Sequence, residues 1–82
     1  GKPASVVEIA VPVDQLDGGS ITLAALLVTL GFCASRGEAR RLVAGGGVRV
    51  DDVKQQDPLV KLGRGRHLVN SGKRNWAWAV VP

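Results

Sequence analysis

Apolar residues recur at helical spacing in the first half of the chain and at alternate positions in the second half. The segment Ile21–Leu30 has leucines three and four residues apart, which predicts a largely buried helix. Ser20 is placed to cap the start of this helix, and Gly31 stands where a left-handed residue commonly ends one.

A second, shorter helix is predicted to start at Ser35. Ser35 and Glu38 have the spacing of a capping box, in which each side chain bonds the backbone N–H of the other residue. Ala39, Leu42 and Val43 would form one narrow apolar face, and arginines would fan out over the remaining arc. The glycine triplet at 45–47 then ends the helix and lets the chain reverse.

The segment after the glycines alternates with a period of two. Val48 and Val50 flank Arg49, and Val53 precedes Lys54, which predicts a hairpin with its turn at residues 51–52. The turn pair is Asp-Asp, whereas two-residue hairpin turns favour Asn-Gly or Asp-Gly because both central residues need positive φ. We therefore expect a turn that is strained or longer than two residues.

The rest of the chain predicts further strands, in "PLVKL", "GRGRHLVN" and "NWAWAVV". The fold class is thus α+β, with two packed helices followed by a small twisted antiparallel sheet. Residues 1–7 resemble a linker or an expression remnant, and residues 8–82 form a single domain with its core motif at 20–56. Pro12 limits the segment near the amino end to a strand outside the centre of a sheet.

Composition limits the size of the domain and the compartment in which it is expected. At 82 residues, with 45% hydrophobic and 22% charged residues, the chain is long enough for one small globular domain. Its nearly uninterrupted apolar run at 21–30 is too short to cross a bilayer, so no membrane partner is expected. Cys33 is the only cysteine and is interpreted as an apolar core residue, which fits a cytoplasmic protein.

Charge is distributed unevenly along the chain. Residues 1–19 hold one lysine against three carboxylates, whereas residues 20–82 hold ten lysines and arginines against four carboxylates. Clustered positive charge in a small domain favours a polyanionic partner, most often nucleic acid, over a merely basic surface. Catalysis is not expected, since there is one histidine, no cysteine pair and no phosphate-binding loop, and no metal or cofactor site is predicted.

Several cations are candidates for RNA contact. A ridge along the second helix and the hairpin would consist of Arg36, Arg40, Arg41, Arg49 and Lys54. The alternative is a solvated helix face in which Glu38 pairs with Arg41. The turn "SGKRN" is equally consistent with phosphate contact and with a plain polar loop.

Two tryptophans and one histidine are the remaining candidates for functional residues. Trp76 and Trp78 lie on one face of the last strand, and we expect that face to be core in preference to a base-stacking platform. His67 is interpreted as a surface or edge residue.

The stretch "LLVTLGFCASRGEARRLVAGGGVRV" resembles the core motif of the RNA-binding domain named after small-subunit ribosomal protein S-four. The flanking "VPVDQLDGGSITLAALL", "DPLVKL" and "GKRNWAWAVV" are similar to the carboxy-terminal domain of bacterial-type tyrosyl-tRNA synthetases. This resemblance covers about residues 8–81. The family usually has Asn-Gly at the hairpin turn and a Lys-Ser pair where this chain has Arg36 and Gly37.

The resemblance implies an appendage that grips tRNA for tyrosine at the anticodon stem and the long variable arm. A separate catalytic domain would use ATP to activate tyrosine, and the appendage itself would have no activity and no cofactor. The implied RNA contacts are Ser35, Arg36, Arg40, Arg41, Lys73 and Arg74. The alternatives are an RNA-binding module of a ribosome-associated protein or a pseudouridine synthase, and a basic module that binds an acidic protein.

Overall fold

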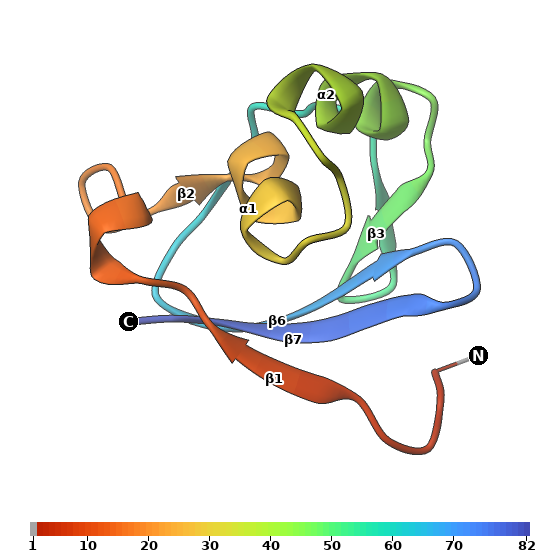
Figure 1. Ribbon diagram of the computed structural model, residues 1–82, viewed down its shortest axis with the longest axis horizontal. Helices are drawn as coiled ribbons and strands as arrows, with labels where there is room; N and C mark the ends of the chain where they lie inside the picture. The colour runs from red at the N-terminus through yellow and green to blue at the C-terminus, as the bar shows by residue number, and fades with distance from the viewer. Residues whose placement is uncertain (1) are drawn as a thin grey trace.

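The computed structural model describes residues 2–82. A five-stranded sheet of order β1-β7-β6-β3-β4 carries both helices on one face, and β2 pairs with β5 in a separate two-stranded sheet (Figure 1). The elements are β1 (Val7–Ala10), a 3-10 turn η1 (Val13–Gln15), β2 (Ile21–Thr22), α1 (Leu23–Thr29), α2 (Arg36–Ala44), β3 (Val48–Val50), β4 (Val53–Gln55), β5 (Lys61–Leu62), β6 (Gly65–Ser71) and β7 (Asn75–Val81).

The α+β class predicted from the sequence is confirmed, with one correction to the sheet. β1 runs parallel to β7, with Val7 opposite Ala77, so the sheet is mixed and not wholly antiparallel. Parallel neighbours need a long connection, and here the chain between β1 and β7 supplies it. Because β1 lies at an edge and ends before Pro12, the expectation that this segment would avoid the sheet centre is confirmed.

The first helix begins later than the sequence pattern predicts. It spans Leu23–Thr29, and its N-cap is Thr22, whose hydroxyl accepts the backbone N–H of Ala25 at 3.3 Å. The prediction of a Ser20 cap and a start at Ile21 was wrong, because Ile21 and Thr22 pair with β5 as a strand. β-Branched residues fit a strand better than a helix, which agrees with this shift.

The hydrophobic core lies between the helices and the inner face of the sheet. The first five residues of α1 are all buried, so this helix is the centre of the domain. The largest fully buried side chains are Leu23, Leu26, Leu27, Val43, Val48, Val69 and Val81. Each such burial contributes about 1.5–3 kcal/mol.

The prediction that Trp76 and Trp78 face the core was wrong. Both are only half-buried, whereas the alternate residues Ala77, Ala79 and Val81 are buried. Successive side chains of a strand point to opposite faces, so the two indoles lie on the outer face, away from the helices. Small residues on the inner face let β7 approach the core, where two indoles would not fit at normal packing density.

Candidate nucleic-acid interface

The start of α2 is specified by Ser35. Its backbone is extended, with φ at −147°, and its hydroxyl accepts the N–H of Glu38 at 3.1 Å. The reciprocal bond of the predicted capping box, from the Ser35 N–H to the Glu38 carboxylate, is not formed in the described chain. Glu38 still places a carboxylate in the first turn, where the helix dipole favours negative charge.

The arginines of α2 point to solvent. Ala39 and Val43 are buried against the rest of the domain, whereas Arg36, Arg40 and Arg41 are exposed. Among residues 2–82, no carboxylate lies within 4.0 Å of these three guanidinium groups, so the alternative of a Glu38–Arg41 ion pair is not supported. The helix therefore presents three arginines that form no ion pair within the described chain, against the single carboxylate of Glu38 in its first turn.

The end of α2 forms a tight reversal. The N–H of Gly46 bonds the carbonyl of Val43 at 2.8 Å, and the N–H of Gly47 bonds the carbonyl of Leu42 at 3.0 Å. These two bonds, with φ of 77° at Gly46, define a Schellman motif. The side chain of Lys54 lies over this loop, so close to Gly46 that a Cβ placed there would collide with its Cε. Lys54 thus joins the end of α2 to the hairpin.

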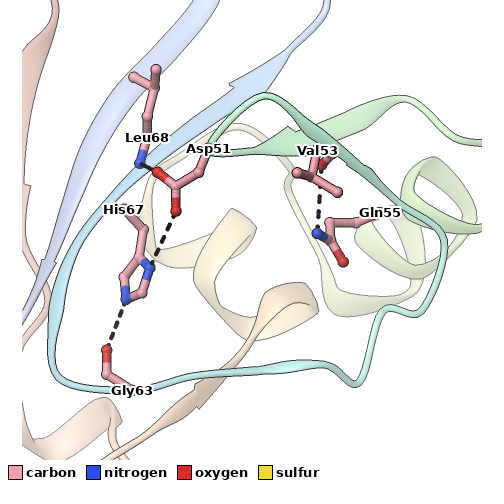
Figure 2. Close-up of polar contacts among 6 residues, drawn as sticks. All are labelled: Asp51, Val53, Gln55, Gly63, His67 and Leu68. Atoms are coloured by element: carbon pink, nitrogen blue, oxygen red, sulfur yellow. Dashed lines mark hydrogen bonds and ion pairs between the residues drawn. The ribbon is translucent and has the colours of Figure 1, made fainter.

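The hairpin turn has two residues and not more, and non-glycine residues occupy both left-handed positions, so of the two expectations the structure supports the strained turn. Val50 pairs with Val53, and both intervening aspartates have positive φ, of 51° and 66°, as a type I′ turn requires. The Asp51 carboxylate points to β6, where it accepts the N–H of Leu68 at 2.9 Å (Figure 2). Asp51 is therefore held in place by the neighbouring strand.

His67 also contacts the hairpin turn, through Asp51. Its Nδ1 lies 3.9 Å from the second carboxylate oxygen of Asp51, and its Nε2 lies 2.8 Å from the carbonyl oxygen of Gly63 (Figure 2). The ring bridges the hairpin turn and the loop before β6. His67 is half-buried on β6, a strand inside the sheet, so the expected surface or edge position is not confirmed. Sequence reasoning missed this arrangement, since it joins residues 16 positions apart.

The hairpin cations lie side by side. Arg49 and Lys54 are directly opposite each other on β3 and β4, and both are exposed. Arg49 projects from the outer face, as predicted, because its neighbours Val48 and Val50 are buried. One guanidinium nitrogen of Arg49 lies 3.4 Å from the backbone oxygen of Asp52.

The turn between β6 and β7 completes the set of predicted residues. Lys73 and Arg74 lie in this turn. Lys73 and Arg49 both line a groove, whose other lining residues are Asp52, Asn70, Gly72 and Trp76. The structure therefore brings Arg49 and Lys73 together on the outer side of the sheet. The three arginines of α2 lie on the helical layer, and the Lys54 side chain extends from β4 over the end of α2. Sequence reasoning did not identify Asn70 as a part of the groove, and it assigned Trp76 to the core.

Another arginine on the outer face is already partnered. Arg66 lies 3.0 Å from a carboxylate oxygen of Glu8 and 3.9 Å from the centre of the Trp78 ring. Lys2 lies 5.3 Å from the same ring centre. Trp78 is thus engaged by two cations of this chain, which distinguishes it from Trp76.

Other chemistry is sparse. Cys33 is buried, and burial, followed by the nearby charge of Glu38, raises the pKa of its thiol. Over residues 2–82, no three His, Cys, Asp or Glu side chains come together as a metal site would require. No helix in the same part of the chain is long and apolar enough to cross a membrane.

Comparison with known families identifies the class of this domain. The S4 domain family model matches residues 21–68, which include both helices, the hairpin and the first part of β6. The match covers more than half of the chain, so the chain belongs to the S4 domain family.

The more particular similarity is to tyrosine-tRNA ligases. The chain is 38% identical over 78 residues to the enzyme of Methylococcus capsulatus and 35% identical over 71 residues to that of Ralstonia nicotianae. These alignments cover 92% and 87% of this chain, and each covers 18% of the relative. A segment of 25 residues is 84% identical to the enzyme of Novosphingobium aromaticivorans, covering 30% of this chain and 6% of the relative. The resemblance inferred from the sequence is thereby confirmed.

Proposed function

We propose that this chain is the RNA-binding appendage of a tyrosine-tRNA ligase and that it grips tRNA for tyrosine. A separate catalytic domain would perform the ATP-dependent reaction, and this chain would need neither cofactor nor metal. The observation that carries the proposal is the exposed helix α2, with three arginines that no carboxylate neutralises, in a domain similar to tyrosine-tRNA ligases over most of its length.

Two groups of cations would make the contacts. The first group lies on α2 and comprises Arg36, Arg40 and Arg41, with the N-cap hydroxyl of Ser35 beside them. Lys54 continues from the end of this helix to Arg49 on the hairpin. Lys73 and Arg74 extend the charged surface to the β6–β7 turn. Folded RNA hides the base edges of its deep groove, so backbone charge and shape would supply most of the recognition.

The test is a titration of the 82-residue chain with tRNA for tyrosine and with a tRNA that has a short variable arm, at several salt concentrations. The variant Arg36→Ala/Arg40→Ala/Arg41→Ala should bind the long-armed tRNA at least tenfold more weakly. Its salt dependence should be shallower by about one unit of slope per lost phosphate contact.

A charge-matched control separates contact from net charge. Lys2→Ala/Lys61→Ala/Arg64→Ala removes the same three charges from positions outside the proposed contacts, and it should weaken binding much less. Equal binding of the two tRNAs, with equal losses in the two triple variants, would contradict the proposal. Binding to an acidic protein without preference for RNA would instead support the protein-interaction alternative.

A further inference from the structure

A groove on the outer side of the sheet combines two cations with an aromatic ring. Its volume is about 510 Å³, within the range of about 300–1,000 Å³ that is usual for small-molecule sites. The arginines of α2 take no part in lining it. The lining residues are Arg49, Asp52, Asn70, Gly72, Lys73 and Trp76.

The groove is built on one row of the sheet. Asn70 is directly opposite Arg49 on one side and Trp76 on the other, so the three side chains share the outer face. Directly opposed residues have Cβ atoms about 4.5–5.5 Å apart. A guanidinium group, an amide and an indole therefore stand next to one another.

Hydrogen bonds hold the groove in shape. The indole Nε1–H of Trp76 donates to the Lys73 carbonyl at 3.2 Å. The Asn70 amide nitrogen donates to the carbonyls of Gly72 and Asn75, at 2.6 and 3.4 Å. The β6–β7 turn, the amide and the indole thus form one connected unit, so a ligand would meet a largely preformed site.

The charge of the groove favours an anion. Arg49 and Lys73 supply two positive charges, and within residues 2–82 neither has a carboxylate oxygen within 4.0 Å. Asp52 is the one carboxylate in the lining, and Arg49 contacts its backbone oxygen. The lining therefore carries a net formal charge of one positive unit.

We propose that this groove binds one unpaired nucleotide of the RNA, with its phosphate at Arg49 and Lys73 and its base against Trp76. Cations that follow the backbone and an aromatic ring that contacts a base are the parts from which single-stranded RNA sites are built. Trp78, already covered by Arg66, does not have this role. This inference rests on the proposed function for the identity of its ligand, and it adds a second contact area away from the helices.

Fluorescence of the two tryptophans tests the inference, because each can be observed alone. Trp78→Phe leaves Trp76 as the only indole, and Trp76→Phe leaves Trp78. Saturation with tRNA for tyrosine, or with a six-nucleotide single-stranded RNA, should quench the Trp76 emission by at least half. The Trp78 emission should change by less than a fifth.

The cations are tested in the Trp78→Phe background. Arg49→Gln and Lys73→Gln should each reduce the quenching at saturation by at least half. Their matched controls are Lys54→Gln, directly opposite Arg49, and Arg74→Gln, next to Lys73 in the turn. These two controls lower RNA affinity through lost charge but keep the quenching amplitude, since neither residue lines the groove.

RNA binding is followed independently by the anisotropy of a labelled RNA, which separates the two proposals. If RNA binds and Trp76 is not quenched, the nucleotide site is refuted and the proposed function stands. If no RNA binds at any salt concentration, both fail. Should Trp76→Phe not fold, the four cation variants still decide the question.

Discussion

Asp51 and Leu68 exchange two hydrogen bonds between the hairpin turn and β6. The Leu68 N–H donates to the Asp51 carboxylate at 2.9 Å, and the Asp51 N–H donates to the Leu68 carbonyl at 2.8 Å. The ladder between β3 and β6 thus continues into the turn, with a side chain in place of a backbone acceptor. The Asp51 carboxylate therefore attaches the hairpin to the sheet. In an Asn-Gly turn, only the asparagine has a side chain that could do the same.

Removal of the Asp51 carboxylate should destabilise the domain. Asp51→Ala leaves the part-buried N–H of Leu68 without its acceptor and places alanine at φ of 51°, at a combined cost of about 2–3 kcal/mol. Asp51→Asn keeps an oxygen acceptor and should stay within about 0.5 kcal/mol of the parent. Urea unfolding followed by circular dichroism measures both, and equal losses in the two variants would show that the hydrogen bond is not the cause.

The glycine after α2 should be far less tolerant than a glycine in an open loop. Gly46→Ala places a side chain at φ of 77° and against Lys54, and should cost about 1–2 kcal/mol. Gly63→Ala is the control, because a Cβ there meets no atom within 4 Å. Thermal unfolding of both variants compares them, and a Gly63→Ala loss as large as that of Gly46→Ala would argue against the backbone explanation.

Ser35 can be tested separately as a cap and as an RNA contact. Ser35→Ala removes the acceptor for the Glu38 N–H and should destabilise the domain by about 1 kcal/mol. Ser35→Asp restores an N-cap and should preserve stability, but its added negative charge beside Arg36 should weaken RNA binding several-fold. Unchanged RNA affinity in a stable Ser35→Asp variant would remove Ser35 from the proposed contacts.

The buried thiol of Cys33 should make stability depend on pH in the alkaline range. Because burial raises its pKa in the folded state, the unfolded chain loses the thiol proton first, from about pH 8.5 upward. The thiol's contribution is therefore complete below that pH and is lost as pH rises toward the folded pKa.

The measurement is the free energy of unfolding between pH 7 and pH 10, for the parent and for Cys33→Ala. The parent should lose more stability over this range than the variant does. Parallel curves would mean that the thiol contributes nothing to the pH dependence. In the native state, alkylation of Cys33 by iodoacetamide should also be much slower than that of a free cysteine.

The sequence predicted correctly those features that depend on interactions between residues close together in the chain. The Ser35 cap, the glycines that end both helices and the alternation around Arg49 each depend on residues within one or two turns of each other. The same signals were insufficient for Ile21 and Thr22, because a distant partner, β5, converted the expected first turn of a helix into a strand.

The sequence by itself determined the two helices, the hairpin, the exposed arginines of α2 and the family resemblance. Only the tertiary structure decided the parallel pairing of β1 with β7 and the outward direction of Trp76 and Trp78. It also decided the meeting of Arg49 with Lys73 at one groove. The physical reason is that alternation along a strand divides its residues between two faces but does not tell which face meets the helices. Close packing beneath the helices requires the small residues of β7 on that face, so the indoles lie on the other one.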